Sequence, residues 1–533
     1  MNRIAEGIRH GPRCEGWTVI RSIAWFKRDL RILDHEPLAA AAANGPIVGL
    51  YVHEPEVLST PEFTAGHLAF IEDCLGELRT EFRRLGSVLL VRHGTMTDVL
   101  DRLHAQWRFD EIRSHQETGL AVTYDRDRRV AAWCRRRDVR WTESPQHGVF
   151  RPLDTRDGWA AKWRRRMSPE PIPSPATIIG PDPEALEILE ADRIPTHESM
   201  GVESDRMSDR QRGGERAGRS MLESFLSDRG EDYQRAMSSP IEGWDSCSRI
   251  SPHLAYGSLS VRSVHHASQV RASELRELEA VGGWRRSISS FQKRLRWHCH
   301  FIQKLEDEPA IEFRNFNRAF DGMRQEDPDS WTSEERERFA AFTSAKTGYP
   351  LVDACLRCLE RTGWINFRMR AMLVSFASYH LWIHWKPVAK HLATRFLDFE
   401  PGIHYSQCQM QSGTTGINTV RIYSPIKQVA DQDPKGEFIR KWVPELREVP
   451  DEFIGRPETM PAMTQHMAGC DIGTDYPAPV VDHATAYREA KARVFAVRGG
   501  RKAKSEAKRV YEKHGSRRRP PSRNASPHRP SGG

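Results

Sequence analysis

The stretch "TGYPLVDACLRCLERTGWINFRMR" (residues 347–370) predicts an amphipathic helix followed directly by a second helical segment. Its apolar residues recur at spacings of three and four, which is the period of one helix face. Gly363 marks the end of the first helix, because glycine is common at that position. The same pattern recurs on both sides of this stretch, so we expect an all-helical domain over residues 213–480.

Arg370 lies on an apolar stripe of the second segment, together with Val374 and Leu381. A charge in such a place needs a partner or a ligand, because burying an unpaired charge is costly. The next acidic candidates along the chain are Asp398 and Glu400. The pattern therefore indicates either a purely structural ion pair or a charged site beside a ligand.

Two further segments bound this domain. Residues 284–309 predict one long helix, and His298 falls on its apolar face, which carries Trp284, Ile288, Phe291, Leu295, Ile302 and Leu305. The segment "EPGIHYSQCQMQSGTTGIN" (400–418) has no helical or strand period. We expect it to be a polar, glycine-spaced loop that wraps around something inside the domain.

Residues 18–150 alternate between strand and helix signals. Short β-branched runs such as "TVIRSIAWF" and "SVLLVRHG" are separated by helical stretches, which predicts a doubly wound parallel sheet. The first turn reads "WFKRDLRILDHEP", so the glycine fingerprint of dinucleotide-binding domains is absent. A Pro-rich and polar connector is expected over residues 151–212.

Charge is concentrated at the C-terminal end. The chain carries a net charge of +8, while residues 500–533 alone hold eleven Lys or Arg and two Glu, a net of +9. We expect residues 481–533 to be a basic, disordered tail, because this composition buries little apolar area. Such a tail either binds nucleic acid non-specifically or is simply solvated.

The remaining composition excludes several classes of protein. No apolar run reaches the roughly 18–20 residues of a membrane helix, and the N-terminus lacks the apolar core of a secretory signal. The nine cysteines are scattered, as in reduced cytoplasmic proteins. Cys355 and Cys358 fall on an apolar helix face, so we interpret them as core residues and predict no metal site.

A cluster of hydroxyl groups and one guanidinium precedes a helical segment in "CSRISPHLAYGSLS" (247–260). Ser248, Arg249 and Ser251 are of the types that hold anions, although such a cluster is more often only a helix cap. Aromatic density is high at Trp364, Trp382 and Trp385, which alone indicates core packing.

Taken together, these motifs are similar to the flavin domain of the photolyase/cryptochrome family. The resemblance rests on residues 347–370, on "SRISPHLAYGSLS", on "GEFIRKWVPEL" (436–446) and on the opening "WFKRDLR". It covers roughly residues 20–460, and the order of the parts also matches. The family implies an α/β doubly wound N-terminal domain followed by an all-α FAD-binding domain.

The resemblance also implies roles for individual residues. FAD-binding positions are Tyr233, Ser248, Arg249, Ile250, Ser251, Phe291, His298, Arg368, Arg370, Asp398, Phe399, Glu400 and His404. Electron-transfer positions are Trp385, Trp382 and Trp331, and DNA-facing positions are Arg294, Trp297, Trp364, Phe367, Met410 and Gln428. His404 or Tyr405 stands at the position facing flavin N5, where repair enzymes usually have Asn.

Some family positions are altered. Arg294 stands where dimer-splitting members have Glu, Met410 replaces a substrate-facing Trp, and Cys408 replaces the flavin-proximal Trp. A neutral thiol carries an electron hole poorly, so photoreduction is expected to use Trp382 or Trp385 directly. The usual tryptophan chain and the usual dimer recognition are thereby put in question.

Three functions are consistent with these residues. The first is a monomeric, light-dependent DNA repair flavoenzyme, a deoxyribodipyrimidine photolyase-like lyase that acts on ultraviolet-damaged DNA. The second is a cryptochrome-type blue-light photoreceptor that signals through the redox state of FAD. The third is a flavin-binding protein without photochemistry. Relatives also imply a second, light-harvesting antenna chromophore in the α/β domain, near "SHQETG" (114–119).

Overall fold

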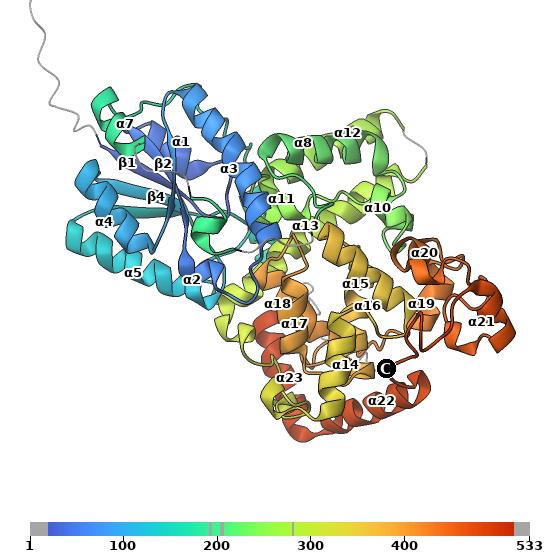
Figure 1. Cartoon of the computed structure of the whole chain (residues 1–533). Coiled ribbons are helices and arrows are strands. Elements are labelled where there is room, and N and C mark those ends of the chain that lie inside the picture. Colours follow the sequence, from blue (N-terminus) through green and yellow to red (C-terminus); the bar gives the residue numbers. More distant parts are fainter. Residues whose placement is uncertain (1–19, 191–194, 203–206, 280–281, 516–533) are drawn as a thin grey trace, which may run out of the picture.

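An α/β part and a helical part lie side by side in the computed structural model (Figure 1). The structure describes residues 20–190, 195–202, 207–279 and 282–515. The expected fold class, a doubly wound domain followed by an all-α domain, is confirmed. The domain boundaries at residues 150 and 212 stay predictions.

The α/β part is built on a five-stranded parallel sheet with the order β3-β2-β1-β4-β5. The strands are β1 (Ser22–Phe26), β2 (Ile47–His53), β3 (Leu89–His93), β4 (Glu111–His115) and β5 (Arg140–Ser144). The quoted runs "TVIRSIAWF" and "SVLLVRHG" form β1 and β3, as expected. The strand order reverses between β1 and β4, and the carboxyl ends of strands beside such a switch point leave a crevice.

Helices cover both faces of this sheet. The flanking helices are α1 (Glu36–Ala42), α2 (Pro55–Leu58), α3 (Ala65–Leu85), α4 (Met96–Gln106), α5 (Ala121–Arg137) and α7 (Pro183–Glu190). Phe26 packs with residues of α1 and α3 on one face, and Trp25 packs with residues of α4 and α5 on the other. Burial on both faces explains why β1 and β2 are largely continuous apolar runs.

The connector contributes α6 (Trp159–Met167), which packs into the helical part through Trp159 and Trp163. The helical part consists of α8 (Glu215–Ser224), α9 (Tyr233–Ala236), α10 (Glu242–Ser246), α11 (Ser251–Ala255), α12 (Val261–Glu277), α13 (Trp284–Asp307), α14 (Ser333–Thr343), α15 (Pro350–Thr362), α16 (Phe367–Ser375), α17 (Trp385–Ala393), α18 (Pro401–Gln411), α19 (Pro425–Gln432), α20 (Glu437–Trp442), α21 (Ala462–Ala468), α22 (His483–Gly499) and α23 (Arg501–His514).

Two expected helices are confirmed. Helix α15 ends at Gly363, whose φ of 72° is in the left-handed region that glycine adopts without strain. Helix α13 buries the predicted apolar face from Ile288 to Leu305 and leaves His298 half-buried. None of the described helices is long and apolar enough to cross a bilayer.

The segment from 400 to 418 differs from the expected loop, because residues 401–411 form helix α18. Pro401 stands in its first turn, where proline is favoured. Gly402 allows close contact with α13, since a Cβ there would lie 2.6 Å from the Cα of Ile302. Polar residues such as Gln409 are buried in this contact, so hydrophobicity alone carries no helical period.

The second segment of the opening stretch is also more complex than one helix. Helix α16 continues into a π-helical turn (Phe376–His380), and the chain then breaks before α17. Trp382 lies in this break with a φ of 59°. Such a conformation costs on the order of 1–3 kcal/mol for a residue other than glycine, so the surrounding contacts must hold it.

The prediction of a disordered tail from residue 481 is wrong over residues 483–514, which form α22 and α23. Val494 packs beside Tyr379, and Val510 packs with Leu305 and Phe316. A few apolar residues on one face are enough to pack each helix against the domain, because the rest of the helix is solvated. Residues 516–533, the end of the predicted tail, lie outside the described residues.

Helix α23 therefore provides a test of this packing. We expect Val510→Asp to lower the free energy of unfolding by roughly 2 kcal/mol or more, because it buries a carboxylate without a partner. Lys508→Asp, on the exposed side of the same helix, should change it by less than about 0.5 kcal/mol. Denaturant unfolding of both variants measures the difference, and equal midpoints would contradict the packed helix.

Candidate functional site

The predicted pair of Arg370 and Asp398 is present. Arg370 Nη1 and Nη2 donate to the two carboxylate oxygens of Asp398 at 2.8 and 2.9 Å, in the two-pronged geometry that guanidinium favours. The Asp398 side chain is 4% exposed and that of Arg370 is 24% exposed. Arg370 also donates through Nε to the Ile365 carbonyl, and its guanidinium lies 4.2 Å from the ring centre of Phe396.

Glu400, the other candidate partner of Arg370, pairs instead with Arg28 of the α/β part. Arg28 Nη2 lies 3.5 Å from the Glu400 carboxylate, and its guanidinium also donates to the carbonyls of Ala255 and Phe399. Burial raises the pKa of Glu400 to about 7, although the charge of Arg28 opposes the shift. The chain therefore ties its two parts together at the start of α18.

Arg249 has an unusual environment. Its φ of 56° is in the left-handed region, and its guanidinium lies 3.8 Å from the ring centre of Trp244 and 5.0 Å from that of Trp364. Its Nε is buried without a hydrogen-bond partner. Burial, together with nearby Arg229, lowers the pKa of Arg249 to about 10. A strained, desolvated cation with an open donor fits a bound anionic group.

The neighbours of Arg249 supply hydroxyls and apolar surface. Ser248 and Ser251 are half-buried, and Ser251 begins the five-residue helix α11. Ile250, Tyr233 and Phe291 are buried in one cluster. The structure therefore brings the predicted diphosphate-binding residues together around one point.

Two of the predicted FAD-binding residues are histidines. Burial, with the charge of Arg28 adding to it, lowers the pKa of His298 to about 4, and its ring lies 5.6 Å from that of His147. Burial likewise lowers the pKa of His404 to about 4, so both imidazoles are neutral at pH 7. His404 donates through Nε2 to the Ala389 carbonyl at 2.8 Å, and its ring lies 5.2 Å from Phe399.

The three predicted electron-transfer tryptophans have different surroundings. Trp385 is fully buried and donates through Nε1 to Asn315 at 2.7 Å. Trp382 is half-buried between the guanidinium groups of Arg324 and Arg493, at 4.5 and 4.9 Å from its ring. Trp331 is buried, and its ring contacts that of Phe339.

The predicted DNA-facing residues separate into exposed and buried groups. Trp297 and Phe367 are 49% and 46% exposed, and Arg294 lies 5.4 Å from the Trp297 ring centre. Trp364 is only 6% exposed and instead contacts Arg249, so it does not share the exposed surface of Trp297. Of the remaining predicted positions, Met410 is half-buried, Gln428 is buried with its Oε1 unpartnered, and Arg368 lies 5.7 Å from the ring of Tyr423.

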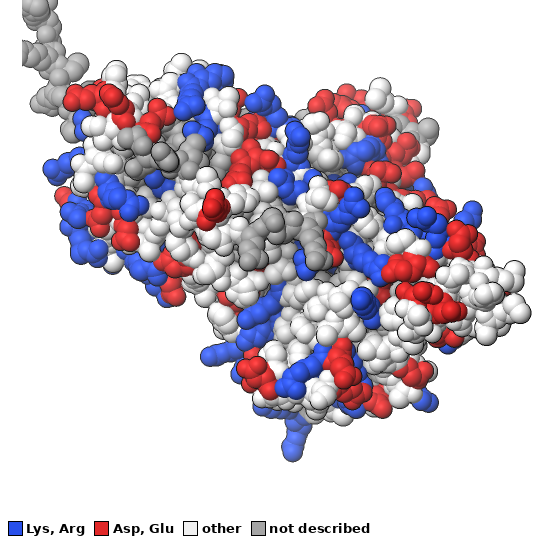
Figure 2. Space-filling model, in the orientation of Figure 1, with Lys and Arg blue, Asp and Glu red and all other residues white. Residues whose placement is uncertain are grey.

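The surface shown in Figure 2 carries both signs of charge. Lys and Arg side chains gather between the positions of α13 and α20 in Figure 1, with acidic side chains at the edge of this region. The sequence patterns did not predict this local basic region. It is of the kind that contacts nucleic-acid phosphates.

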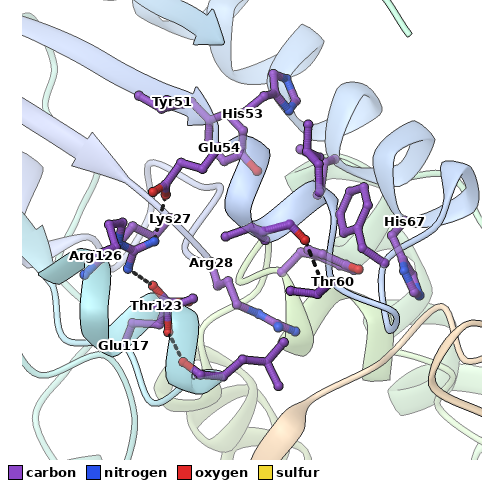
Figure 3. Close-up of a pocket in the computed structure, with 18 of the residues that line it drawn as sticks. Lys27, Arg28, Tyr51, His53, Glu54, Thr60, His67, Glu117, Thr123 and Arg126 are labelled. Atoms are coloured by element: carbon purple, nitrogen blue, oxygen red, sulfur yellow. Dashed lines mark hydrogen bonds and ion pairs between the residues drawn. The ribbon is translucent and has the colours of Figure 1, made fainter. Parts of the chain in front are cut away.

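A cavity opens at the carboxyl ends of β1 and β2 (Figure 3). It encloses about 850 Å3 between its lining atoms, including its open mouth. Arg126 bridges Glu54 and Glu117 at 2.9 and 2.5 Å, and Arg28 points into the cavity. Only Glu117 and Gly119 belong to the segment expected to hold an antenna. The ends of β1 and β2 supply further lining residues, while Tyr256, Phe399 and Pro401 come from the helical part.

Asp29, His35 and His115 form a buried cluster. Asp29 directly follows Arg28, which lines the cavity. Asp29 accepts hydrogen bonds from His35 Nε2 at 3.0 Å and from His115 Nδ1 at 2.7 Å. The Nδ1 of His35 accepts the Leu38 backbone N–H at the start of α1, so Nε2 must carry the proton. A protonated Nε2 cannot bind a metal ion, and hydrogen bonding accounts for the cluster.

Two family models match this chain. One, described as DNA photolyase, covers residues 22–165, and the other, described as the FAD binding domain of DNA photolyase, covers residues 291–496. The chain belongs to the photolyase/cryptochrome family. The family resemblance expected from the sequence is thus confirmed.

Several photolyases and cryptochromes are similar over nearly the whole chain. A deoxyribodipyrimidine photo-lyase of Synechococcus sp. is 27% identical, with 88% of this chain and 95% of that protein covered. A cryptochrome DASH of Natronomonas pharaonis is 29% identical, with 88% and 99% covered. The crystal structure of a bacterial class III photolyase from Agrobacterium tumefaciens has a TM-score of 0.77 and 25% identity, with 91% and 99% covered.

FAD is the cofactor of this photolyase-type domain, and the residues present fit it. Arg249 offers an unpartnered buried donor beside two serine hydroxyls, as a diphosphate requires. Gln407 of α18 likewise has a buried Oε1 without a partner. Sequence reasoning missed Gln407, because nothing in its neighbourhood distinguishes it from the other glutamines of α18.

The Arg370–Asp398 pair generates a direct test. We expect Asp398→Ala to lower the free energy of unfolding by about 3 kcal/mol, since Arg370 would remain charged in a largely buried site. Flavin content should fall with it. Asp451→Ala removes a 62% exposed partner of Arg440, so it should cost less than about 1 kcal/mol. Similar losses in the two variants, measured by denaturant unfolding and flavin absorbance, would contradict a structural role specific to Asp398.

Proposed function

We propose that this protein is a light-dependent DNA repair flavoprotein of the photolyase type. The observation that carries the proposal is the bidentate Arg370–Asp398 pair inside the segment matched by the photolyase FAD-binding model, residues 291–496. Arg249, Ser248 and Ser251 precede that segment and belong to the same helical part. When bound, FAD supplies the light absorption and the electron that splits a pyrimidine lesion. The chain's own residues bind the cofactor, exclude water and present the DNA.

Arg249 and the two serines hold the diphosphate in this proposal. The guanidinium is fixed between two indole rings, so little freedom is lost when an anion binds. Arg370 and Asp398 neutralise each other beside the ring end of the cofactor. The neutral His404 and the thiol of Cys408, whose pKa burial raises well above its usual value, keep further charge away from that end.

DNA contacts come from exposed side chains of α13 and α16. Trp297 and Phe367 offer apolar faces to an extruded base, and Arg294 offers a cation to a phosphate. We further propose that the protein acts as a monomer in the cytoplasm. Within the described residues every cysteine is a free thiol, as in a reducing compartment.

The cavity at the ends of β1 and β2 is the proposed site of a second, antenna chromophore. Its aromatic walls at Trp25 and Tyr51 suit a flat ring, and the Arg126 and Glu54 side chains suit a polar ring edge. The segment expected to hold the antenna, residues 114–119, contributes Glu117 and Gly119 to this site.

A blue-light photoreceptor is the second candidate. It is favoured by Arg294 and Met410, which replace the lesion-facing residues of dimer-splitting relatives, and by the similarity to cryptochromes. Both functions use FAD, so only an assay of DNA repair distinguishes them. Blue-light repair of ultraviolet-damaged oligonucleotides by the reduced protein distinguishes them: restored pyrimidines support the repair function, and bound FAD without repair supports the photoreceptor.

The DNA-facing role of Trp297 is tested by substitution. We expect Trp297→Ala to weaken binding of damaged DNA by roughly 5- to 150-fold, because stacking on one base contributes about 1–3 kcal/mol. Phe313→Ala is the matched control, since Phe313 is 47% exposed but is not a predicted DNA contact. Flavin content should stay unchanged in both. Equal DNA affinity in the two variants, measured by fluorescence anisotropy, would exclude Trp297 from the DNA surface.

A further inference from the structure

Tyr405 is a buried residue of α18 that the family resemblance offered only as the alternative to His404 beside flavin N5, and the proposed function uses His404 there. It is 1% exposed, and its hydroxyl donates to Glu62 Oε1 at 2.6 Å. Glu62 belongs to the α/β part and lines the cavity at the strand ends. A buried tyrosine hydroxyl usually has a hydrogen-bond partner, but a carboxylate partner is also a proton acceptor.

The ring of Tyr405 lies against Trp385. The two ring centres are 6.2 Å apart and the planes meet at 74°. Trp385 is fully buried, and its only assigned polar partner in the described chain is the neutral Asn315. An electron hole on Trp385 would therefore meet an oxidisable phenol at contact distance, with no nearby cation paired to the indole.

An electron hole is less stable on Trp382 than on Trp385. Arg324 and Arg493 lie 4.5 and 4.9 Å from its ring centre, and Arg324 has no carboxylate partner in the described residues. Arg493 is half exposed and pairs with Glu489, so Arg324, which is 3% exposed, has the larger effect. A buried cation beside a ring raises the free energy of a positive charge on that ring. The route expected through Trp382 or Trp385 is thereby narrowed to Trp385.

We propose that Tyr405 is a redox relay that returns an electron to oxidised Trp385 while its phenolic proton passes to Glu62. One electron leaves the Tyr405 ring and restores the neutral indole of Trp385. The O–H bond of Tyr405 breaks, and the proton forms an O–H bond on the Glu62 carboxylate. The products are a neutral tyrosyl radical, reduced Trp385 and protonated Glu62.

The transfer is balanced without a charge left on the phenol. An exogenous thiolate then supplies one electron to the tyrosyl radical, and Glu62 returns the proton to the oxygen. The initial oxidation of Trp385 by light-excited FAD rests on the proposed function.

The test uses the FAD-loaded full chain and identifies radicals by electron paramagnetic resonance after a light flash. We expect a tyrosyl signal in the unmodified protein and only a tryptophan signal in Tyr405→Phe, which keeps the ring and its packing. Glu62→Gln keeps a hydrogen-bond acceptor but removes the proton acceptor, so it should also lose the tyrosyl signal. Decay of the tryptophan radical should slow in D2O only where Tyr405 and Glu62 are intact.

Tyr476→Phe is the matched control. Tyr476 is also fully buried and donates to a buried carboxylate, that of Asp353, at 2.6 Å. Within the described chain no ring contact joins it to a tryptophan, so its loss should leave the tyrosyl signal unchanged. Tryptophan radicals with an unaltered tyrosyl signal in Tyr405→Phe would overturn the relay alone. A chain that binds FAD but forms no radical on illumination would overturn the relay together with the proposed photochemistry.

Discussion

Arg28 connects the two parts of the molecule at the point where both candidate sites meet. It leaves the carboxyl end of β1, donates to the carbonyls of Ala255 and Phe399, and pairs with Glu400. The start of α18 is therefore fixed against the central strand, and the Asp398 that precedes it is held in reach of Arg370. Together with the Tyr405–Glu62 hydrogen bond, this contact holds α18 against the cavity at the strand ends.

Residue patterns predicted the layers of the fold well. Strands buried on both faces and helices with a strong apolar stripe, such as α13 and α15, depend mainly on local sequence. Helix α18 was missed because its buried face is polar, and α22 and α23 were missed because only a few of their residues are apolar. In both cases tertiary contacts decide the structure, which composition cannot reveal.

In the candidate site, too, contacts between residues close in the sequence were predicted and contacts between distant residues were not. Arg370 and Asp398 are 28 residues apart and were predicted as a pair, whereas Tyr405 and Glu62 are 343 residues apart and were not. Glu400 was one of two candidate partners of Arg370, and it pairs instead with Arg28, which lies in the other part of the chain. The family resemblance supplied positions for the flavin, but the altered residues around them are understood only from their contacts.

The packing of α23 against the end of α13 also affects how the protein is made. Arg509 donates to the Phe316 carbonyl across 193 residues, and Val510 completes a cluster with Leu305 and Phe316. At a synthesis rate of about 5–20 residues per second, Phe316 leaves the ribosome roughly 10–40 seconds before that partner arrives. The sheet, in contrast, is complete once β5 has emerged. During this interval the nascent helical part exposes apolar surface that α23 later covers. We therefore expect chaperones to bind the nascent chain mainly at this stage.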